Sequence, residues 1–303
     1  MPVLPLPLFR LLLKLSGRRK RFESTDGLRK AVHLDRMAVD PAPSAALTAG
    51  LTMRKDTVQG RDCYVIAPYQ PTARTRLLYL HGGAHVAEMS AQHWNLVTEL
   101  VRATGCPAHV PIYPLAPESG HTQALAMLEE VYSSLEPVAA AGDLVLMGDS
   151  SGGGLALALA QRMVATGRPA PRDMVLISPW LDLTMAHARS TSTKIRDPWL
   201  DLPGLTQAAL WWAQGQNLSL PQLSPLNGPL RGLGRITVLI GGQDLFVGEC
   251  RALVHNAALE AVPVRFIEEP DMIHVWPLLP LARARPARAM LANIVRGELN
   301  ESR

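Results

Sequence analysis

Residues 144–160 read LVLMGDSSGGGLALALA, and this stretch decides the fold. Its first four residues form an apolar run that predicts a buried strand, and the residues from Leu155 onwards predict a helix. Between the two, residues 148–152 match the pattern G-x-S-x-G in the strand–turn–helix setting of a nucleophile elbow. The cramped turn of an elbow requires small flanking residues, and both flanks are glycine only when Ser150 is central. Ser150 is therefore the candidate nucleophile.

On both sides of this stretch, short apolar runs alternate with helical stretches. Continuous apolar runs are typical of strands that are buried on both faces. Their alternation with helices predicts a mostly parallel sheet with helices on both sides, an α/β fold. We expect strands at 62–67, 77–80, 108–113, 144–148, 174–178, 236–241 and 264–268, and helices at 91–104, 121–135, 155–165, 249–261 and 281–296.

Two regions break the alternation, residues 1–60 and residues 181–234. The second is too long for an ordinary loop and contains several prolines, so we expect it to hold helices of its own. An insert at the carboxyl end of a strand covers the crevice in which open α/β sheets bind ligands, so we interpret it as a lid. Its Trp199, Trp211 and Trp212 either line an apolar pocket or pack within the lid.

A glycine-rich loop, residues 81–85 (HGGAH), directly follows the strand expected at 77–80. Such a loop can aim backbone N–H groups at the negative charge that acyl transfer builds on a carbonyl oxygen, and each donor lowers the barrier by roughly 3–4 kcal/mol. The N–H of Ser151, next to the nucleophile, would be a further donor. Metal binding by His81 and His85 is the alternative. The glycines disfavour the helix that it needs, and no Glu lies between the histidines, so we expect no metal.

A nucleophilic serine needs a base, and the base needs an acid that orients it. His274 follows the strand expected at 264–268, and Asp244 follows the strand expected at 236–241. If these strands are neighbours, both side chains reach the sheet edge that carries Ser150. The resulting order Ser, Asp, His is that of α/β-hydrolases. Alternative acids remain, namely Asp271, which lies on the same loop as His274, and the less favoured Asp182 and Glu249.

Composition excludes several classes of protein. The chain has 303 residues, of which 48% are hydrophobic and 18% charged, so it can bury a large core. A net charge of +4 is small for a polyanion binder, and 5% aromatic residues argue against a surface that stacks nucleic-acid bases. Three cysteines (Cys63, Cys106 and Cys250) without a CxxC motif exclude a disulfide scaffold and favour a reducing compartment. We expect a cytoplasmic protein that binds no nucleic acid.

The first 21 residues combine an apolar run at 8–15 with four basic residues at 18–21. A secretory signal has the opposite order, with its charge before the apolar run. The segment is therefore either a helix that packs on the body of the protein or a helix that lies on an anionic membrane surface. No apolar run is long enough for a transmembrane helix. Membrane association and a homodimer stay open.

Several segments together resemble the hormone-sensitive lipase family of α/β-hydrolases. They are His81–Gly83 (HGG), Tyr113–Glu118 (YPLAPE), Gly148–Gly153 (GDSSGG), Ser224–Leu226 (SPL) and the late Asp244/His274 pair. The resemblance implies an eight-stranded, mostly parallel sheet and ester hydrolysis without a cofactor. It also implies a helical cap built from the N-terminal helices and an insert. The chain then divides into N-terminal cap helices at 1–60, a catalytic domain at 61–180 and 235–303, and a cap insert at 181–234.

Carried over residue by residue, the resemblance places the nucleophile, acid and base at Ser150, Asp244 and His274. It places the oxyanion hole at the backbone N–H groups of Gly83, Ala84 and Ser151, with Gly82 as a further member, and His81 orients the loop.

Departures from the family pattern bear on the substrate. Ala84 stands where a third glycine is usual, and His85 stands where an aromatic residue is usual. We expect a serine hydrolase that cleaves small carboxylic esters with short to medium acyl chains. Alternatives are an amide hydrolase such as a deacetylase or arylformamidase, a ligand-binding homologue without catalysis, and a membrane-anchored scaffold.

Overall fold

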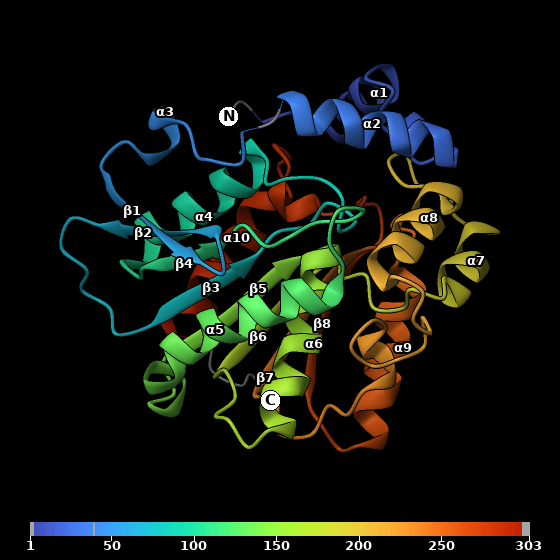
Figure 1. Cartoon of the computed structure of the whole chain (residues 1–303). Coiled ribbons are helices and arrows are strands. Elements are labelled where there is room, and N and C mark those ends of the chain that lie inside the picture. The colour runs from blue at the N-terminus through green and yellow to red at the C-terminus, as the bar shows by residue number, and fades with distance from the viewer. Residues whose placement is uncertain (1–2, 39, 299–303) are drawn as a thin grey trace.

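An eight-stranded sheet forms the centre of the molecule (Figure 1). The computed structural model describes residues 3–38 and 40–298. The strands lie in the order β1-β2-β4-β3-β5-β6-β7-β8; β2 pairs antiparallel with both β1 and β4, and the other pairs are parallel. The predicted mostly parallel sheet is confirmed. Its strands are β1 Leu51–Val58, β2 Arg61–Pro68, β3 Arg76–Leu80, β4 Ala108–Pro111, β5 Leu144–Asp149, β6 Asp173–Ile177, β7 Arg235–Gly241 and β8 Val264–Glu269.

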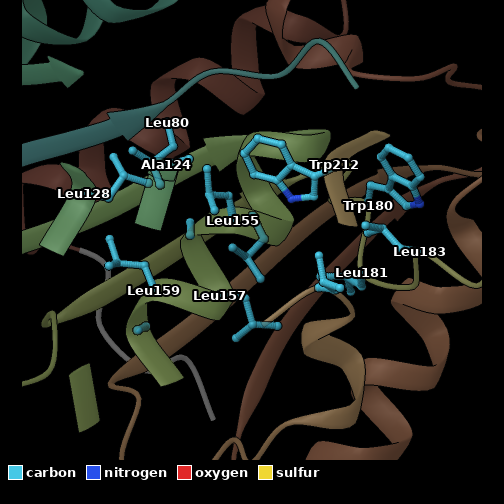
Figure 2. Close-up of a cluster of buried hydrophobic side chains, with 14 of the residues drawn as sticks. Leu80, Ala124, Leu128, Leu155, Leu157, Leu159, Trp180, Leu181, Leu183 and Trp212 are labelled. Carbon is cyan, nitrogen blue, oxygen red and sulfur yellow. The ribbon is translucent and has the colours of Figure 1, made fainter. Parts of the chain in front are cut away.

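Successive side chains of a strand point to opposite faces of the sheet. In the parallel strands both sets of side chains are apolar, so each face of the sheet carries a core. In β3, Leu78 and Leu80 belong to one core, whereas Leu77 and Tyr79 belong to the other. The first core contains α5 His121–Ala140, α6 Ser151–Ala165 and α9 Val247–Leu259, and part of it is shown in Figure 2. The second contains α4 Ala91–Thr104 and α10 Ala284–Arg296. The predicted helices all form, and α6 begins directly after Ser150.

One strand was not predicted. The expected boundary at residue 60 places residues 51–58 with the N-terminal cap helices, but they form β1, which pairs with β2 along its whole length. β1 is an edge strand, and only Leu51 in it is buried. The sequence LTMRKDTV therefore lacks the apolar face that reveals a strand, and its charges are typical of a protected sheet edge.

The N-terminal segment and the insert pack on one another. The first holds α1 Leu6–Leu15, η1 Arg18–Arg21, α2 Thr25–Ala38 and α3 Ala45–Thr48; the second holds α7 Ala186–Ser192, α8 Leu202–Ala213 and η2 Pro225–Asn227. The N–H of Gly204 in α8 donates to the carbonyl of Phe22 (2.7 Å), where a Cβ on residue 204 would lie 2.5 Å from the Phe22 Cα. We call residues 3–48 and 181–234 together the cover. That they act as a cap remains a prediction.

Most of the basic residues at 18–21 contact other parts of the protein. Arg19 donates to the carbonyls of Asp197 and Leu200 and pairs with Asp201 (2.6 Å), all in the insert. Arg18 lies over the Trp199 ring, 4.9 Å from its centre, and Arg21 pairs with Asp35 of α2. The segment therefore packs on the body of the protein, as the first interpretation expects.

The apolar helix before that run is only partly covered. Leu13 of α1 is buried, and α1 is held by Arg10, which donates to the carbonyl of Asp271 (2.9 Å). Four leucines of α1, at positions 8, 11, 12 and 15, are 42–74% exposed. Among the described residues, no helix is long and apolar enough to cross a membrane.

Candidate active site

The structure brings the predicted nucleophile, base and acid together. Ser150 follows β5, Asp244 follows β7, and His274 follows β8. His274 Nδ1 lies 2.9 Å from Asp244 Oδ2, and His274 Nε2 lies 3.0 Å from Ser150 Oγ. A carboxylate can only accept, so Nδ1 carries the proton and Nε2 is free to accept from the Ser150 hydroxyl. This is the hydrogen-bond chain of a serine nucleophile, its base and the orienting acid.

Ser150 is held in a strained backbone conformation. Its φ of 51° and ψ of −125° lie where L-residues are rarely found, and its N–H donates to the carbonyl of Ile177 (2.8 Å). The flanks must be small: a Cβ on Gly148 would lie 2.3 Å from the carbonyl oxygen of Gly152, and one on Gly152 would lie 2.2 Å from that of Leu80. The glycine pattern in the sequence therefore reflects a real steric demand.

The acid controls the charge of the base. Burial by itself would lower the pKa of His274, but the Asp244 carboxylate and its hydrogen bond raise that pKa above 6.5. Asp244 is fully buried, and its second oxygen accepts from the N–H of Phe246 (3.0 Å). An imidazole with a raised pKa is a better proton acceptor, which suits a base that must deprotonate a serine.

The glycine loop faces the nucleophile in an unusual conformation. Gly83, Ala84 and His85 all have positive φ, at 132°, 54° and 60°. The N–H groups of Gly83 and Ala84 donate to no group among the described residues, and both residues line the same cavity as Ser150. Ser151 is the first residue of α6, so its N–H has no partner within the helix. All three donors remain available for an oxyanion.

Gly82 is different from these three residues. Its N–H donates to Asp149 Oδ1 (3.0 Å), so it is not available to an oxyanion, and its placement in the oxyanion hole is wrong. His81 behaves as expected of a loop-orienting residue: Nδ1 bonds to the carbonyl of Gly82 (2.7 Å). His85 stacks on Trp212 with ring centres 4.0 Å apart, and the described residues contain no group of three metal-ligating side chains.

Asp149, the residue before the nucleophile, holds the glycine loop against the elbow. Its carboxylate accepts from the Tyr79 hydroxyl (2.5 Å) and the Gly82 N–H, and it lies 3.3 Å from His93 Nε2. Burial would raise the pKa of Asp149, but these partners, His93 first, lower it below its usual value. His93 could not be selected from the sequence, because it lies in a helix with no motif around it.

Comparison with known proteins identifies the family. Residues 77–278 match the family described as alpha/beta hydrolase fold. The chain belongs to this family. A triacylglycerol lipase of Mycobacterium tuberculosis is 32% identical over 240 residues, which are 79% of this chain and 50% of that protein, so the chain spans about half of its length. An acetyl-hydrolase of Streptomyces hygroscopicus is 35% identical over 223 residues, 72% of this chain and 74% of that protein.

Solved structures agree with this assignment. An esterase/lipase from an uncultured bacterium superposes with a TM-score of 0.81 at 25% identity and covers 96% of this α/β-hydrolase and 97% of that chain. A hormone-sensitive lipase from a metagenome library superposes with a TM-score of 0.83 at 22% identity, covering 99% and 100%, which establishes the shared fold. The predicted membership of the α/β-hydrolases is confirmed.

A cavity of about 290 Å³ opens onto the predicted nucleophile and base. Ser150, His274, Gly83 and Ala84 line it on the side of the sheet, and residues of η1 and α2 together with Trp199 of the cover line it as well. Trp199 therefore lines a pocket, as one interpretation of the lid tryptophans expects. Trp211 and Trp212 pack in the core instead. The apolar walls include Phe22, Leu28, Val32, Leu200, Val275 and Leu278, and the polar ones include Glu88, Ser90 and Gln92.

The alternative acids lie elsewhere. Asp271 is exposed, and its carbonyl receives Arg10. Asp182 caps its own turn through Thr184, and Glu249 accepts from the N–H of Leu181 (2.8 Å). None of their side chains hydrogen-bonds to His274, whereas Asp244 does.

A further buried carboxylate next to the acid loop was not predicted. Asp197 of the insert accepts from the N–H groups of Trp199 (2.7 Å) and Leu200 (2.9 Å) through one oxygen. Its other oxygen accepts from the N–H of Leu245 (3.0 Å), the residue after the acid. Burial and the nearby Asp244 charge raise the pKa of Asp197 to about 6. Asp197 thus ties the cover directly to the catalytic residues.

Proposed function

We propose that this α/β-hydrolase cleaves carboxylic esters through a covalent acyl-enzyme. The observation that carries the proposal is the continuous chain of hydrogen bonds from Ser150 through His274 to Asp244, next to N–H groups of the glycine loop that have no partner among the described residues. Its relatives include proteins named triacylglycerol lipase and acetyl-hydrolase.

The steps follow from these positions. Nε2 of His274 takes the hydroxyl proton as Ser150 Oγ attacks the ester carbonyl, and Asp244 stabilises the resulting imidazolium. The N–H groups of Gly83, Ala84 and Ser151 stabilise the oxyanion. His274 then gives the proton to the leaving alcohol, and an acyl-serine forms. Water, deprotonated by His274, attacks the acyl carbon; the bond between that carbon and Ser150 Oγ then breaks, His274 returns the proton to Oγ, and the free acid leaves.

We propose short to medium acyl chains. The cavity of about 290 Å³ has mainly apolar walls and holds a small ester more readily than a long-chain lipid. An amide hydrolase is the alternative, because the same residues can cleave either bond and the name of the acetyl-hydrolase relative specifies neither. Comparison of the rates on a short ester and its matched amide decides between the two.

Replacement of Ser150 by alanine is the direct test. Wild type is expected to hydrolyse p-nitrophenyl butyrate and to react with a fluorophosphonate probe. Ser150→Ala is expected to lose both properties, with a fall in kcat of roughly 10⁴-fold or more, because the covalent step needs this oxygen. Ser151→Ala is the matched control, since its backbone N–H is kept, and it should still be labelled. Equal rates for wild type and Ser150→Ala would contradict the proposal, and a chain that never reacts with the probe would point to a ligand-binding protein.

A further inference from the structure

One carboxylate in the catalytic cavity keeps an oxygen without a partner. Glu88 lies four residues after Ala84, and its side chain is 11% exposed. Its Oε2 is buried and accepts no hydrogen bond from any residue in the described part of the chain. Buried carboxylate oxygens are normally satisfied, because an unpaired one loses its hydration without compensation. Glu88 also lines the catalytic cavity, so a group bound in that cavity is the candidate partner of its carboxylate.

The nearest cation cannot supply the missing bond. Arg36 of α2 lies 3.9 Å from the other oxygen of Glu88, Oε1. Its guanidinium already donates to the carbonyls of Val86 (2.8 Å) and Ala116 (3.0 Å) and to Glu118 (3.1 Å). Arg36 is therefore fixed between α2 and the loop, where it balances part of the Glu88 charge and leaves Oε2 open.

The other acids that line the cavity are fully engaged. Asp35 pairs with Arg21 through both oxygens (2.8 and 3.0 Å). Asp149 is occupied by Tyr79, Gly82 and His93. Glu88 thus differs from both, although all three line one cavity whose remaining walls are mainly apolar.

We propose that the Glu88 carboxylate is a subsite that accepts a hydrogen bond from the substrate, so that the hydrolase prefers esters that carry a hydroxyl or ammonium group near the reacting carbonyl. This inference rests on the proposed ester hydrolysis and specifies its substrate class. A buried acceptor that the correct substrate satisfies also discriminates against the analogue that lacks the donor, because that analogue leaves the acceptor unpaired.

Matched pairs of esters test the preference. On the acyl side, p-nitrophenyl 3-hydroxybutyrate is compared with p-nitrophenyl butyrate. On the alcohol side, 4-hydroxybutyl and 4-aminobutyl acetates are compared with butyl acetate. One half of the ester, acyl or alcohol, lies next to Glu88 when the substrate is bound. For the pair that differs in that half, we expect kcat/KM to be roughly 10- to 100-fold higher for the donor-bearing ester, which corresponds to the free energy of a hydrogen bond to a charged group.

Two substitutions make the test specific to the carboxylate. Glu88→Leu removes the acceptor, so kcat/KM should fall for the donor-bearing ester and rise for the donor-free ester. Unfolding cannot produce opposite changes of this kind. Glu88→Gln keeps an oxygen but loses the charge, so a preference for hydroxyl should persist in part and a preference for ammonium should vanish. Glu118→Gln is the matched control, because that exposed carboxylate also contacts Arg36 but does not line the cavity, and it should leave the ratio between the esters unchanged.

The outcomes separate the inference from the function on which it rests. Hydrolysis of the butyrate and acetate esters without a preference on either half overturns the subsite alone. A preference that survives Glu88→Leu also overturns it, because the donor would then bind elsewhere. If wild type hydrolyses none of the esters and ignores the fluorophosphonate probe, the proposed function itself has failed.

Discussion

The catalytic edge of the sheet and the cover above it share one cavity, but they are built in different ways. At the edge, the loops after β3, β5, β7 and β8 bring together backbone donors and three side chains that are joined in a chain by two hydrogen bonds. The cover contributes mainly apolar walls and touches the edge through a few polar contacts, such as that of Asp197 with Leu245. The edge is suited to chemistry, and the cover to selecting what reaches it.

The largest loss of activity is expected from a substitution that disables the catalytic edge without changing its shape. Asp244→Asn should lower kcat by about 10⁴-fold, because an amide stabilises the wrong imidazole tautomer and cannot balance the imidazolium charge. Steady-state kinetics on a p-nitrophenyl ester measure the change. Asp271→Asn, on the same loop as His274 but exposed, is the matched control and should stay close to wild type. A large loss in Asp271→Asn with little in Asp244→Asn would reverse the assignment of the acid.

The pH dependence sharpens the same point. Neutral His274 is the active base, and its pKa is raised above 6.5 by Asp244, so kcat/KM of wild type should fall as the pH drops through that raised value. In Asp244→Asn the raising charge is gone and burial remains, so the acid limb should move to lower pH. A pH–rate profile between roughly pH 5 and 9 shows the shift. An unmoved limb would mean that Asp244 does not control the base.

Asp197 tests how far the cover controls the edge. In Asp197→Asn one amide group must face N–H donors on both sides, so its NH₂ group meets either Leu245 or the Trp199–Leu200 turn. The acid loop should shift, and a misplacement of that kind costs on the order of 10- to 100-fold in kcat/KM. The negative charge of Asp197 also helps to raise the pKa of His274, so the acid limb should move to lower pH. A purely structural defect would lower the rate without moving the limb. Asp201→Asn is the control, because Asp201 lies in the same insert but contacts Arg19 of the N-terminal segment and should leave the acid limb where it is.

The same contrast explains which features could be predicted from the sequence. Ser150, Asp244 and His274 were identifiable because an elbow, a glycine loop and the strand order each make local demands on residue type. Asp197, Glu88 and His93 were not, because their roles come from neighbours that are distant along the chain and no motif surrounds them. β1 was missed for a related reason, since a polar edge strand has no buried face to shape its sequence. Gly82 was wrongly predicted as an oxyanion donor, because the sequence shows that a glycine lies in the loop but not that its N–H already donates to Asp149.

The smallest effect on the chemistry is expected at the outer face of the cover. Leu8, Leu11, Leu12 and Leu15 form one exposed stripe of α1 at helical spacing, with Lys14 and Lys20 also exposed nearby. An anionic lipid surface matches this combination of apolar and basic groups, so we expect the protein to sediment with vesicles that contain phosphatidylglycerol and less with pure phosphatidylcholine.

Leu11→Asn/Leu15→Asn should abolish that binding and keep hydrolysis of a soluble ester near the wild-type rate, because neither residue lines the cavity. Truncation of the N-terminal segment would be a poor test, since η1 forms part of the cavity wall and Arg19 holds the insert in place. A second copy of the chain could cover the stripe instead of lipid, and light scattering tests this alternative. It holds if wild type is a dimer, the double variant is a monomer and wild type does not bind vesicles. Vesicle binding by a monomeric wild type would instead show that the cover turns one face to the active site and the other to lipid.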